Sequence, residues 1–277
     1  MRPLVLKLGG ELVETPAGRA NIAAFAAATA ASRPLVVVHG GGRAVDAELD
    51  RRAIAPKKID GLRVTDAATL EVVVAVLAGS ANTELVAALV AAGVLAVGLT
   101  GVDAGLGQAV RVSAHHTASG ETADLGFVGD PVDADSSLVR LLLDRGYVPV
   151  VASIGIERAA GRGDAPGPGL LNVNADVMAG RLAAALGDCD LAIAGATAGV
   201  LDAEGRAIAT LARGGIDGLI AGRTATAGMI AKLEAARAAL AAGVISVRII
   251  DGRALDAQHG VESAPGTQLV AREVTRR

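Results

Sequence analysis

Short apolar runs followed by glycine-rich turns and alanine-rich stretches recur along the chain. Six of these runs predict β-strands, at residues 4–8, 35–38, 95–99, 147–152, 191–194 and 244–250. The runs are continuously apolar rather than alternating, which is typical of parallel strands buried under helices on both faces. The pattern therefore predicts an α/β sandwich with a mainly parallel open sheet.

Helix boundary signals agree with this prediction. Thr15 followed by Pro16 predicts a helix N-cap with proline in the first turn. The helices predicted at 81–92, 175–186 and 228–242 end at glycines, which are Gly93, Gly187 and Gly243.

Two segments depart from the pattern. Residues 108–130 lack helical periodicity, and we expect them to form a hairpin on one edge. The glycine- and proline-rich stretch 161–169 predicts a loop between two αβ halves. We therefore expect an N-terminal lobe at 1–165 and a C-terminal lobe at 166–277.

Composition and charge exclude several classes of protein. The 277 residues hold 26 Lys+Arg and 29 Asp+Glu, and the formal charge of −3 provides no basic surface for nucleic acid. Aromatic residues make up only 1% of the chain, which excludes stacking platforms for bases. Cys189 is the single cysteine, so neither an internal disulfide nor a cysteine-built zinc site can form, and we expect it to be a small core residue.

The chain also gives little reason to expect a membrane protein. Lys7 interrupts the first apolar run, so no signal peptide is recognisable. Residues 85–102 carry no charge over 18 positions, but glycines break the stretch, and we interpret it as a buried helix, turn and strand. We expect a cytoplasmic protein without membrane or nucleic-acid partners.

Two predicted strands end in features suited to an anion. Lys7 precedes Gly9 and Gly10, and a buried cation requires an anion unless the lysine side chain extends to the sheet edge. His39 precedes three glycines, 40–42, which form either an anion-binding nest at a helix N-terminus or simply a tight turn. We expect His39 to form a local hydrogen bond, and the pair His115-His116 to lie on a surface hairpin.

Five further polar residues stand out. Arg63 suits a carboxylate, although a lone arginine is more often a solvated surface charge. Asn172, Asn174 and Asp176 precede or open a predicted helix, and helix capping explains only one of them. Lys232 lies at the edge of an apolar helical stripe rather than on a plainly solvated face.

Taken together, these elements resemble the amino acid kinase family, and in particular its members that phosphorylate N-acetyl-L-glutamate in arginine biosynthesis. The order and spacing of the matching stretches extend over nearly the whole chain: KLGG at 7–10, VHGGG at 38–42, GLRVT at 61–65, AVGL at 96–99, GYVPVV at 146–151, NVNAD at 172–176 and GMIAK at 228–232.

The resemblance implies a three-layer αβα sandwich with the acylated amino acid and the dimer contact in the first lobe and ATP in the second. It implies transfer of the γ-phosphoryl group to a side-chain carboxylate, with Mg²⁺ as cofactor and no metal ligand assigned to the protein. Because a glutamate-like carboxylate is already ionised at neutral pH, no general base is needed. Charge neutralisation and positioning dominate such a transfer.

The resemblance also implies roles for individual residues. Lys7 and Lys232 would be the transition-state cations, and Asp176 would hold them in place. The expected substrate-binding residues are Gly41, Gly42, Arg63, Asn172 and Asn174. The expected ATP-binding residues are Gly9, Gly10, Gly199, Thr224 and Thr226. Gly195-Ala196 stands where the family usually has a Ser/Thr-Asp pair.

Two alternatives remain open at this point: a related kinase for N-succinylglutamate or a carrier-bound aminoadipate, and a non-catalytic nucleotide-binding member of the fold. In arginine-inhibited members an N-terminal helix links dimers into a hexamer, and here only three residues precede the first predicted strand. We therefore expect a homodimer that L-arginine does not inhibit, with the apolar helix at 67–78 in its interface.

Overall fold

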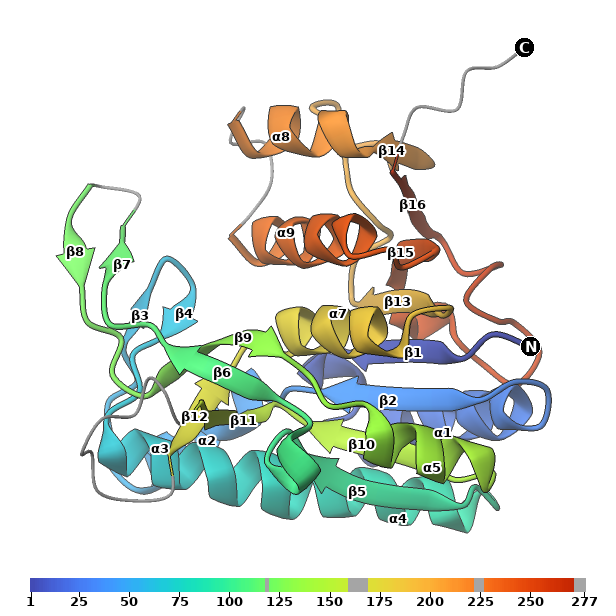
Figure 1. The fold of residues 1–277 in the computed structure, drawn as a ribbon, viewed down its shortest axis with the longest axis horizontal. Helices are drawn as coiled ribbons and strands as arrows, with labels where there is room; N and C mark the ends of the chain where they lie inside the picture. The colour runs from blue at the N-terminus through green and yellow to red at the C-terminus, as the bar shows by residue number, and fades with distance from the viewer. Residues whose placement is uncertain (118–119, 159–168, 222–226, 272–277) are drawn as a thin grey trace.

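An eight-stranded sheet forms the centre of the computed structural model, which describes residues 1–117, 120–158, 169–221 and 227–271 (Figure 1). The strand order is β14-β16-β15-β13-β1-β2-β10-β5. Neighbouring strands are parallel except for β15 and β16. The bounds are β1 Leu4–Leu8, β2 Leu35–His39, β5 Ala96–Thr100, β10 Val148–Ala152, β13 Asp190–Gly195, β14 Thr210–Ala212, β15 Ser246–Asp251 and β16 Gly266–Val270. All six predicted strands are confirmed.

Helices cover both faces of this sheet. Successive residues of a strand point to opposite faces, so Leu4, Leu6 and Leu8 of β1 pack in one core with Phe25, whereas Val5 packs in the other with Leu182. The first core lies under α1 (Pro16–Ala30) and α4 (Asn82–Ala91). The second lies under α5 (Ser137–Asp144), α7 (Ala175–Leu186) and α9 (Ala227–Ala241), with α8 (Arg213–Ala221) beyond α9 (Figure 1). The expected three-layer sandwich is confirmed.

The predicted helix boundaries are also confirmed. Thr15 Oγ1 accepts a hydrogen bond from Gly18 N at 3.1 Å and caps α1. Gly93, Gly187 and Gly243 have positive φ and follow α4, α7 and α9, where a left-handed residue satisfies the last carbonyls of a helix.

A second, smaller sheet stands beside the carboxyl ends of the central strands. Strands β6 (Gln108–Arg111), β9 (Val128–Asp133), β11 (Ile154–Glu157) and β12 (Leu170–Val173) close into a four-stranded barrel. A Cβ added at Gly129 would lie 2.9 Å from the Leu171 side chain, so a small residue permits this closure. The hairpin predicted at 108–130 is present, since β6 and β9 are antiparallel. Its predicted position on one edge is wrong, because β6 and β9 pair with β11 and β12 instead.

Two short hairpins project next to the barrel. One joins β3 (Lys58–Ile59) to β4 (Leu62–Arg63), and the other joins β7 (His115–His116) to β8 (Thr122–Ala123). The surface hairpin predicted for His115-His116 is thus confirmed, and His115 Nε2 lies 2.9 Å from Asp60 Oδ2 of the other hairpin.

A long apolar helical run leads into β5. It comprises α3 (Ala67–Val74), a π-helical segment (Ala75–Ala81) and α4, and by length and composition alone it could cross a membrane. Within the fold, 39% of its most apolar window is buried, and α4 packs against α1, β5 and β10. The helix, turn and strand expected at 85–102 correspond to α4, the turn at Gly93 and β5.

The lobe boundary predicted at residue 165 lies outside the described residues, as does most of the loop predicted at 161–169. The nearest strands on either side of it, β11 and β12, pair in the barrel, and the nearest strands of the central sheet, β10 and β13, belong to one continuous sheet. The expected core position of Cys189 is confirmed, because its side chain is fully buried, and this burial raises the pKa of the thiol to about 12.

Candidate active site

Lys7 lies near the carboxyl end of β1, between β2 and β13. It points to the face that α7 covers, and only 7% of its side chain is exposed. An ammonium group buried this deeply is costly unless it is paired. Its partner is Asp176 in the first turn of α7, with Nζ 2.8 Å from Oδ1.

The second oxygen of Asp176 faces another cation. Lys232 projects from α9, and its Nζ lies 3.4 Å from Asp176 Oδ2. The side chains of Asp176 and Lys232 are 8% and 17% exposed. Two lysines therefore share one carboxylate, and the cluster keeps a net positive charge that an anion can neutralise.

The pKa values of this cluster follow from burial and charge. Burial by itself raises the pKa of Asp176, but the charges of Lys7 and Lys232 outweigh it and hold this pKa below its ordinary value. Burial first, and the charge of Lys7 second, lower the pKa of Lys232 against the opposing effect of Asp176. The carboxylate is therefore ionised, and Lys232 gives up its proton more easily than an exposed lysine.

Two glycine turns lie beside the lysines. Gly9 and Gly10 follow β1, and Gly40 to Gly42 follow β2 and lead into α2 (Gly42–Arg51). The turns approach closely, because a Cβ at Gly10 would lie 3.0 Å from the Cα of Gly41. Backbone N–H groups at such a helix N-terminus suit an anion.

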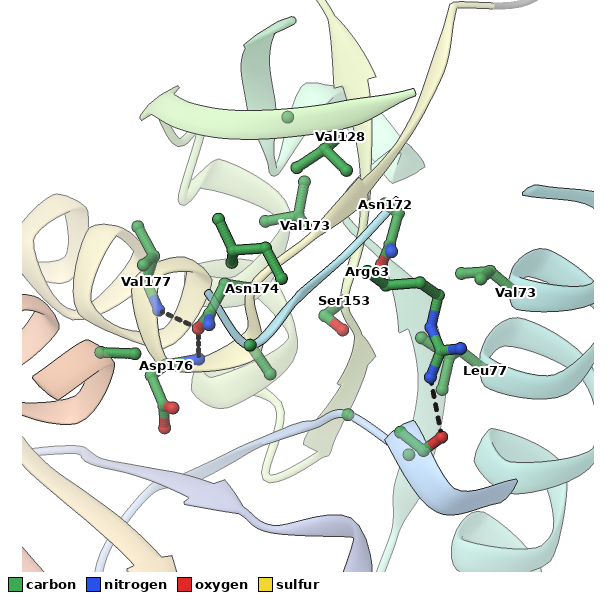
Figure 2. A pocket seen from close by; sticks show the side chains of 18 of the residues that line it. Arg63, Val73, Leu77, Val128, Ser153, Asn172, Val173, Asn174, Asp176 and Val177 are labelled. Atoms are coloured by element: carbon green, nitrogen blue, oxygen red, sulfur yellow. Dashed lines mark hydrogen bonds between the residues drawn. The ribbon is translucent and has the colours of Figure 1, made fainter. Parts of the chain in front are cut away.

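These elements enclose a cavity of about 520 Å³ (Figure 2). Lys7, Asp176 and Lys232 contribute to its lining, and Val45, Val73 and Leu77 supply apolar wall. Of the residues predicted for the site, the cavity also brings together Gly9, Gly10, Gly41, Gly42, Arg63, Asn172 and Asn174.

Arg63 is not a solvated surface charge. Its side chain is 8% exposed, and its Nη1 lies 2.5 Å from Oδ1 of Asp46 on α2. Its Nη2 donates to the carbonyl of Gly42 at 3.0 Å (Figure 2). The other oxygen of Asp46 lies 2.7 Å from Nζ of Lys58. Burial tends to raise the pKa of Asp46, but the bonds from Arg63 and Lys58 bring it below its ordinary value.

The two asparagines differ in their local roles. The Asn174 side chain accepts hydrogen bonds from the backbone N–H groups of Asp176 and Val177, at 2.8 and 3.2 Å, and so caps α7 (Figure 2). This is the one capping role that the sequence allowed for. Asn172 donates to Thr65 Oγ1 at 3.1 Å instead.

Of the predicted nucleotide residues that the structure describes, Gly199 is not among the cavity lining. Gly199 lies in the turn after β13 with φ +106°, where a Cβ would lie 2.6 Å from Thr267 Oγ1. Thr224 and Thr226 lie outside the described residues.

The structure adds residues that the sequence reasoning missed. Asp46 follows Gly42 by one helical turn, so the same-face spacing could have indicated it. Ser153 follows the end of β10 and lines the cavity, as expected at the carboxyl end of a parallel strand. Glu11 follows Gly10, lines the cavity, and accepts a hydrogen bond from Ala196 N at 3.1 Å.

The donor set of a resident metal site is not found in the described ranges. No group of three or more His, Cys, Asp or Glu side chains is placed there to hold a metal ion.

Comparison with known proteins adds a family match. The model of the amino acid kinase family matches residues 2–251. Over 270 residues the chain is 40% identical to acetylglutamate kinase of Solibacter usitatus, covering 96% of this chain and 98% of that enzyme.

Solved structures agree on the fold. The structure of smu.665 from Streptococcus mutans UA159 superposes with a TM-score of 0.74 at 27% identity, covering 97% of this chain and 98% of that one. The structure of N-acetylglutamate synthase from Neisseria gonorrhoeae, complexed with coenzyme A and N-acetyl-glutamate, gives a TM-score of 0.79 at 23% identity. It covers 99% of this chain, which spans 60% of that protein.

Proposed function

The chain belongs to the amino acid kinase family, and we propose that it transfers the γ-phosphoryl group of ATP to the side-chain carboxylate of N-acetyl-L-glutamate. The products are N-acetyl-L-glutamyl 5-phosphate and ADP, in arginine biosynthesis. The alignment with acetylglutamate kinase along almost the whole chain supports this substrate. The observation that carries the proposal is the cluster of Lys7, Asp176 and Lys232 on one cavity.

This cluster suits the main difficulty of the reaction. The accepting carboxylate and the γ-phosphate are both anions, so the transfer requires positive charge rather than a base. Lys7 and Lys232 supply it, and Asp176 holds both ammonium groups in place. Preorganised charge of this kind needs no rearrangement during the reaction.

The remaining residues divide between the two substrates. Arg63, with its guanidinium oriented by Asp46, would bind a carboxylate of the acylated amino acid, and Asn172 and Asn174 would contact the same molecule. The backbone N–H groups of Gly41 and Gly42 would face this substrate, and those of Gly9 and Gly10 the transferring phosphoryl group. For Gly199, Thr224 and Thr226 the contacts with ATP remain predictions.

Mg²⁺ would enter this site with ATP. It is commonly bound through one or two carboxylates together with substrate phosphates, and the carboxylate of Glu11 next to Gly9 and Gly10 fits such a role. When bound, the ion would neutralise phosphate charge.

We also propose that the protein is a cytoplasmic homodimer. The sequence placed the helix at 67–78 in the interface, but its Val72, Val73, Val76 and Leu77 are buried in the core of the same chain, so we propose a different contact. Strand β5 is the last of the central sheet, and nearby Val90 and Leu95 are 55% and 58% exposed. An apolar sheet edge of this kind favours pairing with a second copy. The cytoplasmic location accords with the use of ATP.

A hydroxamate assay for acyl phosphate tests the proposed reaction. Purified protein with MgATP should form the hydroxamate with N-acetyl-L-glutamate more efficiently, by kcat/KM, than with N-succinyl-L-glutamate or N-acetyl-L-α-aminoadipate. If only one of the other two compounds gave product, the proposed substrate would be wrong. An absence of product with all of them, in a protein that still binds ATP, would contradict the activity.

A further inference from the structure

Asn82 is a buried amide that joins two strands of the central sheet to the end of a third. It is the first residue of α4 and is only 5% exposed. Its Nδ2 lies 2.9 Å from the carbonyl oxygen of Val150 on β10 and 3.3 Å from that of Leu99 on β5. The same nitrogen lies 3.1 Å from Nε2 of His39, the last residue of β2.

These contacts determine the proton arrangement on His39. Backbone carbonyls only accept hydrogen bonds, so the group that faces them must be the amide nitrogen of Asn82. This nitrogen has two hydrogens for three acceptors, and the two shorter contacts, to Val150 O and to His39 Nε2, take one hydrogen each. An amide nitrogen does not accept hydrogen bonds, so Nε2 of His39 must be the acceptor. The single proton of the neutral ring is then on Nδ1, which lies 3.1 Å from the carbonyl oxygen of Gly40 and donates to it.

The environment of His39 agrees with a neutral ring. The residue is fully buried, and burial lowers its pKa more than the hydrogen bond to Gly40 raises it. Gly40 is the first residue of the turn that continues into Gly41 and Gly42. The hydrogen bond from His39 Nδ1 to its carbonyl therefore fixes the start of the glycine loop at the cavity.

The helical run before Asn82 contacts the same loop independently. A Cβ added at Gly41 would lie 2.9 Å from Cδ2 of Leu77, which belongs to the π-helical segment that ends just before Asn82. Isolated π-helical turns are frequent at functional sites. On the other side of the amide, a Cβ at Gly98 would lie 2.3 Å from Asn82 Oδ1, so only glycine leaves room for the observed orientation.

We propose that Asn82 is a positioning residue for the reaction: by holding His39 as the Nδ1–H tautomer, it fixes the Gly40–Gly42 loop against the acylated amino acid. The identity of the molecule that the loop binds rests on the proposed function. The coupling between Asn82, His39 and Gly40 does not, and it can be measured without any substrate.

The first experiment reads the tautomer in the ligand-free protein. Nitrogen-15 NMR of histidine-labelled protein at pH 7.5, with His39→Gln to assign the signal, should show the Nδ1–H form for His39. Asn82→Asp replaces the donor with an acceptor, so the signal should change to the Nε2–H form or to imidazolium. A wild-type His39 with its proton on Nε2, or a signal that Asn82→Asp leaves unchanged, would overturn the proposal.

The second experiment perturbs Asn82 without altering a donor or acceptor. Gly98→Ala should displace the amide, and Gly79→Ala is the matched control, since nothing lies within 4 Å of its added Cβ. By calorimetry, Gly98→Ala should weaken N-acetyl-L-glutamate binding roughly fivefold, the effect of one lost hydrogen bond, and leave ATP binding within about twofold.

Unchanged binding of N-acetyl-L-glutamate by Gly98→Ala, or an equal loss for both ligands, would count against the positioning role. Wild-type protein that does not bind N-acetyl-L-glutamate at all would instead contradict the proposed function. The tautomer measurement would then decide the coupling by itself.

Discussion

Two ammonium groups and one carboxylate form the centre of the site, so positive charges outnumber negative ones there. Asp176 neutralises one positive charge, while Lys7 and Lys232 bring two. In a buried place such an excess is unfavourable until an anion arrives. The site therefore favours an anion, and the predictions at the scale of single residues follow from it.

Removing either lysine should slow the chemical step. Lys7→Ala and Lys232→Ala should each lower kcat by about 10²–10³, the usual effect of losing one preorganised charged or polar group. In Lys232→Ala the Asp176 carboxylate keeps Lys7, so the melting temperature should change little. Steady-state kinetics and thermal melting followed by circular dichroism measure both. Turnover near wild type in either variant would contradict the assignment.

The pH dependence of kcat and kcat/KM should report the protonation of Lys232. Burial and then Lys7 lower its pKa, so the free enzyme should lose this proton below the value of about 10.4 of an ordinary lysine. Bound phosphates raise the pKa again. The alkaline limb of kcat/KM for ATP should therefore lie at lower pH than that of kcat.

The matched variant for the pH profile is Lys232→Arg. A guanidinium stays protonated throughout this range, so the variant should lose the alkaline limb whatever its remaining rate. Coincident limbs for kcat and kcat/KM in the wild type would show that Lys232 does not titrate as expected.

Asp46 should share the phenotype of the arginine that it orients. Arg63→Ala and Asp46→Asn should each raise KM for N-acetyl-L-glutamate, about tenfold for one weakened charged hydrogen bond, with KM for ATP nearly unchanged. Asp50→Asn on the same helix is the control, because Asp50 is exposed. Equal effects on both substrates would remove Arg63 from the carboxylate site.

At the scale of elements, the distance between α7 and α9 sets the reacting geometry. Asp176 is on α7 and Lys232 on α9, and the two helices pack against each other through small residues. A Cβ added at Gly180 would lie 3.3 Å from the carbonyl oxygen of Ala235 and 3.7 Å from Cβ of Ala239. Close backbone packing thus holds the second lysine at the carboxylate.

A wedge between these helices should disturb catalysis more than substrate binding. Gly180→Val should lower kcat at least tenfold, since displacements of about 1 Å at a reacting centre can cost 10²-fold. KM for N-acetyl-L-glutamate should change little, because its predicted contacts lie on other elements and at the α7 N-terminus. Gly214→Val on α8, where an added Cβ meets nothing within 4 Å, is the control. An unchanged kcat in folded Gly180→Val would contradict the prediction.

At the scale of the whole molecule, the edge of the central sheet should be the contact between two copies. Sedimentation equilibrium should give a dimer, and Val90→Lys with Leu95→Lys should shift it toward monomer by placing charge in the apolar contact. Ile245→Lys, 52% exposed before β15 in the other half of the sheet, should leave the dimer intact. A monomer, a hexamer, or a dimer whose dissociation the double substitution leaves unchanged would each refute this interface.

The sequence by itself determined the features that depend on local pattern. Continuous apolar runs predicted the strands because a strand buried on both faces has no polar side, and Gly93, Gly187 and Gly243 marked helix ends because left-handed backbone suits glycine. The ordered motifs indicated the family, and with it ten of the residues that line the cavity.

Only the tertiary structure decided which side chains meet. Lys7, Asp176 and Lys232 come from three elements that are far apart in the sequence, and no local periodicity records their convergence. The same holds for the closure of β6 and β9 into a barrel, for Asp46 against Arg63, and for Asn82 against His39. The physical reason is that a sequence pattern reports which face of an element is buried, whereas the partner on that face depends on how distant elements pack.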